Sequence, residues 1–316
     1  MLRLIARRLL VGLLVLFVVS LLVFGASLLL PGDAAQAILG RTASPDRLAV
    51  LREQLHLDQP GYQRYLSWLG DLFTGSLGDS LANGQPVAEL VGQRTANSAV
   101  LLLCSAVIAT PLSIIAGTWS ALRRGRAVDN VVSTGTLVLA ALPEFVIGIL
   151  LILFFSTTVL HWFPAVALVD ENRSLFAQSA VLVLPTLTLV LAVSPYITRM
   201  MRATMLEVLD SEFVQQARLK GLPERVVLVR HALPNAIGPV AQVIALQLAW
   251  LAGGVVIVEY LFRFPGIGQG LVDAVTNRDL PTLQALVMLI AFVYVLCNLL
   301  ADVVSILSNP RLRTAR

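Results

Sequence analysis

Charged side chains are scarce in this sequence. Asp, Glu, Lys and Arg together supply only 13% of its 316 residues, whereas apolar residues supply 57%, and the mean hydropathy is +0.82. A soluble domain of this length could not hide so many apolar side chains from water. The composition therefore excludes an ordinary soluble protein and predicts a polytopic membrane protein.

Lysine is almost absent, and this limits what the chain can bind. Lys220 is the only lysine, and it is followed by Gly221-Leu222 instead of being preceded by a glycine-rich phosphate loop, so no Walker-type nucleotide site can be built. The net charge is +4, but the basic residues are not concentrated in one domain that could bind the phosphate backbone of a nucleic acid. We therefore expect no ATP hydrolysis by this chain and no nucleic-acid partner.

Histidine and cysteine are also rare. The three histidines are scattered, and Cys104 and Cys297 both lie within apolar stretches, where they are interpreted as small buried side chains. No pair of acids lies at helical spacing inside an apolar stretch, as an intramembrane aspartyl enzyme would need. The run Gly266–Gly270 follows no predicted strand and is interpreted as a tight turn. We expect no catalytic residue, cofactor or metal in this chain.

Five stretches without Asp, Glu, Lys or Arg are long enough to cross the hydrocarbon core of a bilayer, which takes roughly 20 residues. They are Leu9–Gly32, Thr95–Leu122, Ser174–Thr198, His231–Val258 and Leu280–Ala301. A sixth stretch, from Asn130 to about Leu160, is interrupted only by Glu144. The expected fold is thus an all-α polytopic membrane protein with six transmembrane helices.

Basic residues favour the cytoplasmic side of a membrane. If both termini are cytoplasmic, the inner segments carry most of the Lys and Arg residues, including six between Arg199 and Arg230. We therefore expect both termini inside. The first apolar run exceeds the roughly 7 to 15 residues of the apolar part of a signal peptide, so we expect a retained helix there.

The largest water-facing region is predicted on the outer side, over residues 33–94. Ser44-Pro45 opens one predicted helix, and residues Tyr62 to Phe73 give a second amphipathic run. Two short helices of this kind cannot bury their apolar faces alone. We expect them to pack on the helix bundle or on a partner protein.

A short polar helix is predicted between the fourth and fifth spans. Ser211 fits the N-cap position, Glu212 places an acid in the first turn, and Arg218 and Lys220 place bases at the end. Gly221, with a proline two residues later, ends the helix. A helix with its own start and stop on the basic side of a membrane indicates a docking site for a cytosolic protein; an ordinary inter-helix loop is the alternative.

One face of this helix carries Phe213, Ala217 and Gly221 at helical spacing. The face is apolar enough to enter a groove and small enough for another backbone to approach it. We therefore predict that Ala217 and Gly221 lie where the helix docks.

Around this helix the sequence resembles the inner-membrane permease subunits of peptide-importing ABC transporters, in the dipeptide and oligopeptide branch. The resemblance covers nearly the whole chain. The matching stretches are Met205–Phe213, Ala217–Leu222, Arg230–Ala236, Val258–Tyr260, Phe264–Gly268, Val272–Val275, Asn277–Asp279, Leu57–Pro60 and Gly75–Ser80.

The broader superfamily pattern is Glu-Ala-Ala, three residues, Gly, nine residues, then Ile-x-Leu-Pro. Here Gln215 and Gln216 stand before Ala217, and His231 replaces the isoleucine. These departures weaken the superfamily motif but not the fit to the peptide branch, whose loops often lack the first glutamate.

The resemblance implies a single permease domain over residues 1–316. It places a first transmembrane helix at 9–32, an extracytoplasmic amphipathic region at 33–94, a five-helix core at 95–305 and a coupling loop at 199–236. Within that loop the resemblance implies an ATPase-coupling helix between the fourth and fifth spans. Its residues are Ser211, Glu212, Phe213, Gln216, Ala217, Arg218, Lys220 and Gly221.

The resemblance also implies the assembly. Such permeases pair with a second homologous permease subunit as a heterodimer, carry two cytosolic ATPase subunits and receive cargo from an extracytoplasmic solute-binding protein. The chain is thus expected in the lipid bilayer of the inner (plasma) membrane, forming half of the pathway of an ATP-driven importer of small peptides. Importers of nickel complexes, glutathione or haem use nearly the same permease, and the sequence does not separate these cargoes.

Glu144 is unusual, because a carboxylate within an apolar span needs water, a partner or a proton. One interpretation places it beside the translocation pathway. The other gives it a structural hydrogen bond at the turn loosened by Pro143. If the chain were an ion-coupled secondary transporter instead, Glu144 would be the leading candidate for the coupling-ion site.

Overall fold

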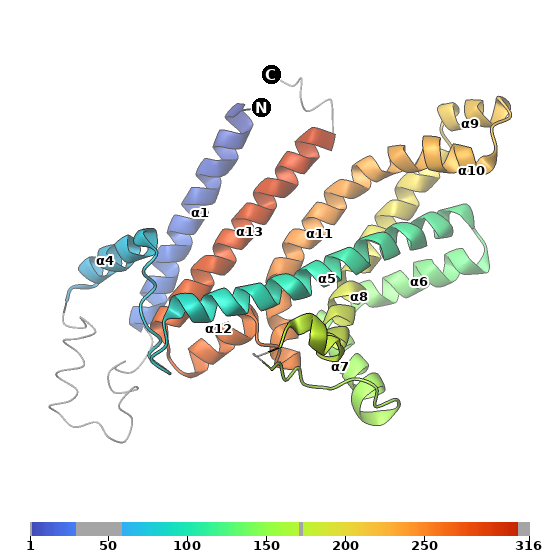
Figure 1. Cartoon of the computed structure of the whole chain (residues 1–316). Helices are drawn as coiled ribbons and strands as arrows, with labels where there is room; N and C mark the ends of the chain where they lie inside the picture. Colours follow the sequence, from blue (N-terminus) through green and yellow to red (C-terminus); the bar gives the residue numbers. More distant parts are fainter. Residues whose placement is uncertain (1, 30–58, 171–172, 309–316) are drawn as a thin grey trace.

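The computed structural model describes residues 2–29, 59–170 and 173–308 (Figure 1). Within these ranges all regular secondary structure is helical, and the only β pairing is an isolated bridge between Asp79 and Pro86. The all-helical prediction is confirmed for this part of the chain. The helix predicted at Ser44-Pro45 lies outside the described residues.

Five helices exceed 25 residues. They are α1 (Leu2–Leu29), α5 (Val87–Leu122), α8 (Ser179–Leu209), α11 (Leu233–Phe262) and α13 (Leu280–Ser308). Within the described residues, five helical segments are long and apolar enough to cross a membrane: Ala6–Leu28, Val87–Leu122, Leu175–Leu209, Glu224–Leu251 and Leu280–Leu299. Each overlaps one of the five uncharged stretches of the sequence, so these stretches are confirmed as helical candidate spans.

The sixth predicted span is bent. It consists of α6 (Ala127–Ala141) and α7 (Glu144–Ile152), which a π-helical turn, η2 (Leu153–Thr158), prolongs, and its two arms meet at 105°. The break falls where Pro143 lacks an N–H and forces Leu142 into an extended conformation, with φ −90° and ψ 131°. A second bend of 72° separates the end of α11 from α12 (Ile267–Thr276). The described residues thus provide five to seven candidate spans, and the count of six stays a prediction.

The long helices extend beyond the uncharged stretches, and two of them cross the domain boundaries drawn from the sequence. α5 begins at Val87, inside the range 33–94, and α8 continues to Leu209, inside the range 199–236. A charged residue ends an apolar run in the sequence, but the helix can continue through it when the charge forms an ion pair. The guanidinium of Arg94 in α5, for example, lies 3.1 Å from the carboxylate of Asp273 in α12. The domain boundaries drawn from the sequence stay predictions.

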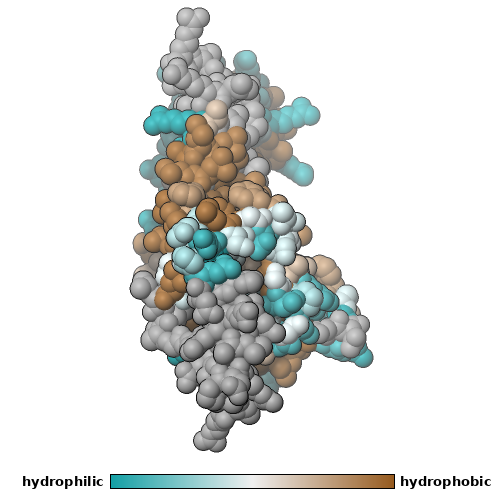
Figure 2. All heavy atoms as spheres, turned by 90° about the vertical axis from the view of Figure 1, so that its left-hand side faces the viewer, coloured by the Kyte–Doolittle hydropathy of each residue, from teal (hydrophilic) through white to brown (hydrophobic). Residues whose placement is uncertain are grey.

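The second amphipathic run of the outer region is α4 (Gly61–Thr74), and it packs on α1. The rings of Tyr65 and Trp68 lie 5.4 and 5.8 Å from that of Phe24, and the Tyr65 hydroxyl lies 2.9 Å from that of Ser20. Figure 2 views this side of the molecule and shows apolar side chains gathered over a broad part of it. This helix therefore packs on the bundle, one of the two arrangements expected.

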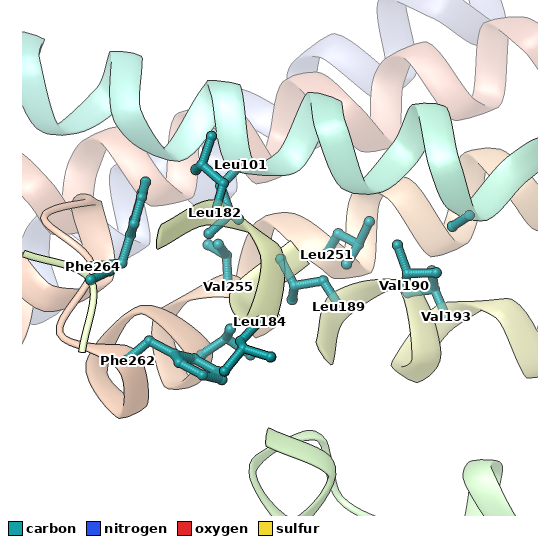
Figure 3. Packing of buried hydrophobic residues seen from close by; sticks show 13 residues of the cluster. Leu101, Leu182, Leu184, Leu189, Val190, Val193, Leu251, Val255, Phe262 and Phe264 are labelled. Atoms are coloured by element: carbon teal, nitrogen blue, oxygen red, sulfur yellow. The ribbon is translucent and has the colours of Figure 1, made fainter. Parts of the chain in front are cut away.

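The main apolar core lies between α5, α8 and α11 (Figure 3). Leu101 of α5, Leu189 of α8 and Leu251 of α11 are all at most 1% exposed and belong to one cluster. Gly148 lets α7 approach this group, because a Cβ there would lie 2.5 Å from the side chain of Leu261. The core thus fixes α8 at the centre of the structure.

The remaining elements are short. They are η3 (Leu175–Gln178), α9 (Glu212–Leu219), α10 (Glu224–Val226) and the π-helical turn η4 (Val227–Ala232). The start of α1, the end of α13 and α9 all lie toward the top of Figure 1, and α9 lies at its upper right.

Candidate functional site

The helix predicted between the fourth and fifth spans is α9, and its ends are confirmed. It begins at Glu212 with Ser211 at the N-cap, and it is followed by Gly221 at a φ of 75°, a conformation that favours glycine. The Ser211 hydroxyl does not cap α9 as expected: it donates a hydrogen bond to the carbonyl of Val208 in α8. The start of α9 is thereby tied to the end of α8.

The two faces of α9 have different surroundings. Val214 and Ala217 are 0% and 5% exposed, whereas Phe213 and Leu219 are 44% and 87% exposed. The sequence grouped Ala217 with Phe213 and Gly221 on the docking face, but Ala217 packs inward, because it lies one turn after Val214 against the same core.

Exposed residues of α9 and of the turn after it form a surface that we call the α9 outer face. It consists of Glu212, Phe213, Gln216, Leu219, Lys220 and Gly221. At Gly221 an added Cβ would meet no atom within 4 Å. Of the residues predicted to couple to an ATPase, those on this face are free to touch another protein. Leu219 was not singled out from the sequence, since a lone leucine at the end of a short helix carries no distinctive signal.

The inner face of α9 belongs to an apolar core shared with three long helices. This core joins α9 to α5, α8, η4 and α11, and its buried members are Ala121, Ile197, Met201, Met205, Val214, Ala217, Val227, Ala232, Ala236 and Val240. Close-packed interiors transmit displacement instead of absorbing it. α9 is thus packed in the same core as the ends of α8 and α11.

An ion pair closes the turn after α9. The Arg218 guanidinium donates to both carboxylate oxygens of Glu224, at 2.6 and 3.2 Å. The Glu224 carboxylate raises the pKa of the Arg218 guanidinium, which stays charged. Both side chains are well exposed, so the pair contributes at most about 1 kcal/mol of stability. Arg218 thus shapes the turn and is not a free cation for a partner.

Glu144 is the first residue of α7, directly after the break at Pro143. Its side chain is half-buried, and within the described residues it has no hydrogen-bond partner. The structural hydrogen bond that one interpretation required is therefore missing from this part of the chain. The pathway role of Glu144 stays a prediction.

Three buried carboxylates outside α9 join distant parts of the chain, and the sequence assigned a role to none of them. The first is Asp129, at the start of α6. Its two oxygens accept hydrogen bonds from Nε and Nη2 of Arg202 in α8, at 2.6 and 2.8 Å. The Ser120 hydroxyl in α5 and the amide of Gly125 donate to the same carboxylate. This cluster connects α5, α6 and α8 near α9.

The second is Glu259 in α11, which is 0% exposed. The Ser98 hydroxyl of α5 and the amide of Gly268 in α12 donate to its carboxylate. Gly266 is required here by close approach, since a Cβ would lie 2.2 Å from a Glu259 oxygen. The tight turn predicted over Gly266–Gly270 is therefore found only at Gly266, because Gly268 and Gly270 lie in the first turns of α12.

The third is Asp279, just before α13. The hydroxyls of Ser80 and Thr282 donate to its carboxylate, as does the amide of Leu81 at 3.0 Å. Ser80 and Asp279 both belong to stretches quoted above for the family resemblance. The resemblance could have indicated Glu259 and Asp279 as sites of interest, but only the fold reveals their partners.

Comparisons with known proteins show the family of the chain. The family described as "binding-protein-dependent transport system inner membrane component" matches residues 109–314, and the family for the N-terminal part of such membrane components matches residues 1–102.

Similar proteins are found over the full length. A probable peptide ABC transporter permease protein of Sinorhizobium fredii is 36% identical over 309 residues, covering 98% of each chain. A putative peptide transport system permease protein of Brucella abortus is 36% identical over 310 residues, again covering 98% of each. A glutathione transport system permease protein of Escherichia coli is 36% identical over 313 residues, covering 99% of each.

The family match spans most of the sequence, the relatives align from end to end, and the described residues contain several membrane-long apolar helices. This chain belongs to the family of inner-membrane components of binding-protein-dependent transport systems, and it is a multi-pass membrane permease.

Proposed function

We propose that this chain is one of two homologous permease subunits of an ATP-driven importer of small peptides, and that α9 is the helix through which a cytosolic ATPase moves it. The observation that carries the proposal is that α9 has one exposed face with apolar residues and one buried face. Its outer face exposes Phe213 and Leu219 at the end of the structure, while its inner face is part of the core of α8 and α11.

In this proposal the outer face of α9 enters a groove of an ATPase subunit, as amphipathic helices enter grooves in many complexes. ATP-driven closure of two such subunits displaces α9, and the displacement passes through Val214 and Ala217 to Met201 and Met205 of α8. The permease pair then changes from an inward-open to an outward-open state.

The proposed orientation places α9 and both termini in the cytoplasm. It is supported by the basic residues around α9 and by the positive-inside rule. The remaining partners of the proposal are a second permease subunit and an extracytoplasmic solute-binding protein. ATP hydrolysis is assigned to the two ATPase subunits, not to this chain.

Small peptides are the proposed cargo because two of the similar proteins are named as peptide permeases. Glutathione is the second candidate, favoured by the glutathione permease that is equally similar. Glutathione is itself a small peptide, so both proposals need a passage for a polar, flexible, charged molecule. Nickel complexes and haem stay as alternatives from the sequence.

The test is transport by the complete importer in proteoliposomes with ATP on the ATPase side. We expect uptake of defined dipeptides and tripeptides that needs ATP and the loaded binding protein, and no uptake when the partner permease is left out. Glutathione, a nickel complex and haem are assayed in parallel to rank the cargoes.

The second part of the test reconstitutes this chain alone in proteoliposomes. We expect neither ATP hydrolysis nor peptide flux from it, even under a proton or sodium gradient. Gradient-driven flux through the single chain would overturn the proposal of an ATP-driven importer. The chain would then be a secondary transporter, and Glu144 would be the candidate site for the coupling ion.

A further inference from the structure

A buried charge cluster around Asp129 and Arg202 lies near α9, at the end of the molecule that we propose to be cytoplasmic. The coupling mechanism proposed above assigns it no role. The side chain of Asp129 is only 4% exposed, and both of its carboxylate oxygens accept hydrogen bonds. Arg202 binds it with both prongs of the guanidinium, and Ser120, Gly125 and Ser133 supply further donors. Such two-pronged geometry is the strongest and most directional form of ion pair between side chains.

The cluster joins elements that are otherwise separate in the chain. Ser120 lies in α5, Gly125 in the turn after it, Asp129 in α6 and Arg202 in α8. Arg202 is in the last third of α8, whose end is tied to the start of α9 by the Ser211 hydroxyl. The cluster thus connects the α5–α6 hairpin to the helix that leads into α9.

The backbones of α5 and α8 also approach closely beside the cluster. A Cβ on Gly117 would lie 2.6 Å from the carbonyl oxygen of Thr198 and 2.7 Å from Met201. One turn earlier in α5, the Ser113 hydroxyl donates to the carbonyl of Ser194. Small residues at this spacing let the backbones of two membrane helices approach closely.

We propose that the α5–α6 hairpin moves as one body with α8 and α9 during the transport cycle, and that the Asp129–Arg202 ion pair is the clamp that holds this body together. The inference rests on the proposed importer function and adds to it the residues that carry the displacement of α9 to α5 and α6. In this proposal Asp129 and Arg202 are positioning residues, because their hydrogen bonds join α5, α6 and α8.

A nearby ion pair supplies a matched control. Arg124 in the α5–α6 turn lies 3.3 Å from Asp210, between α8 and α9, and it spans the same two parts of the structure. Its side chains are 66% and 73% exposed, and exposed pairs contribute little because water screens them. Arg124→Gln and Arg202→Gln thus remove the same charge from the same region, but only the second breaks the buried cluster.

The functional test uses the complete importer in proteoliposomes and measures peptide molecules moved per ATP hydrolysed. We expect Arg202→Gln and Asp129→Asn to assemble with the ATPases but to lower this ratio by about fivefold or more, a typical size for a coupling between sites. Arg202→Lys keeps the charge and is expected to restore part of the ratio. Arg124→Gln is expected to match the wild-type importer.

A distance measurement keeps the proposal testable if a variant folds poorly. Spin labels replace Val131 of α6 and Gln215 of α9, both of which are exposed. In the otherwise wild-type importer we expect one narrow distance that is the same in the nucleotide-free and ATP-trapped states. With Arg202→Gln we expect the distribution to broaden or shift between these states.

Two results would overturn the proposed clamp. The first is a distance between the labels at positions 131 and 215 that changes between the two states in the importer without further substitutions. The second is a ratio of peptide transported to ATP hydrolysed that is unchanged from the wild type in both Arg202→Gln and Asp129→Asn. Neither result affects the importer itself, which is judged only by ATP-dependent peptide uptake of the wild-type complex. The two proposals therefore fail in different measurements.

Discussion

The Ser98 hydroxyl in α5 donates a hydrogen bond to the carboxylate of Glu259 in α11, 161 residues further along the chain. The same Ser98 oxygen accepts a hydrogen bond from the amide of Ile267 at 2.8 Å, and the second Glu259 oxygen accepts one from Gly268 at 2.6 Å. One buried serine and one buried carboxylate thus join α5, α11 and the start of α12. Because both carboxylate oxygens act as acceptors here, the site is suited to a carboxylate and not to a neutral amide.

Glu259→Gln is expected to destabilise the permease. The glutamine amide group turns a donor toward the donors of Ser98 or Gly268, and a buried donor left without an acceptor costs about 1–3 kcal/mol. The measurement is thermal unfolding of the purified complex in detergent, with the exposed Glu89→Gln as the control of equal charge change. Equal melting temperatures for the two variants would show that the Glu259 carboxylate is not needed to hold the bend.

Gly221→Asp is expected to uncouple the importer while leaving the permease in the membrane. Gly221 faces open space next to α9, so an added carboxylate meets the docked ATPase and not its own chain. We expect transport to fall by about fivefold or more, together with loss of stimulation of ATP hydrolysis by loaded binding protein.

Gly84→Asp is the matched control for that variant. Gly84 has a φ of 71°, close to that of Gly221, and also faces open space. The backbone strain of a side chain in this conformation, roughly 1–2 kcal/mol, is therefore common to both variants. If both variants lose transport equally, strain and not docking explains the effect.

Ala217→Leu is expected to lower the melting temperature of the complex. Ala217 is 5% exposed in the core that α9 shares with α8 and α11, and extra methylene groups in a packed core cost about 1–3 kcal/mol. Gln215 is exposed and lies outside the α9 outer face, so Gln215→Leu is expected to leave the melting temperature unchanged. An unchanged melting temperature for Ala217→Leu would contradict the inward placement of this residue.

Glu144→Gln is expected to change transport without affecting assembly. The carboxylate lies at the bend between α6 and α7 and has no hydrogen-bond partner within the described residues, so its substitution costs little stability. Peptide uptake across a pH series is the measurement, because only the wild-type residue can change its charge. Uptake equal to that of the wild type at every pH would mean that Glu144 does not border the pathway.

Several features of this protein follow from the sequence alone. The membrane class and the five candidate spans depend on the length of apolar runs, and the end of α9 depends on residues such as Gly221, whose positive φ favours glycine. These are local properties, decided by neighbours within a few turns. The family, too, was readable from short stretches around α9.

Only the tertiary structure decided which residues meet. Asp129 and Arg202 are 73 residues apart, and Ser80 and Asp279 are 199 apart, so no periodicity in the sequence relates them. The inward turn of Ala217 depends likewise on where α8 and α11 place their apolar faces. A buried carboxylate is stable only where the fold gathers donors around it, and that gathering is a property of helix packing, which local sequence does not determine.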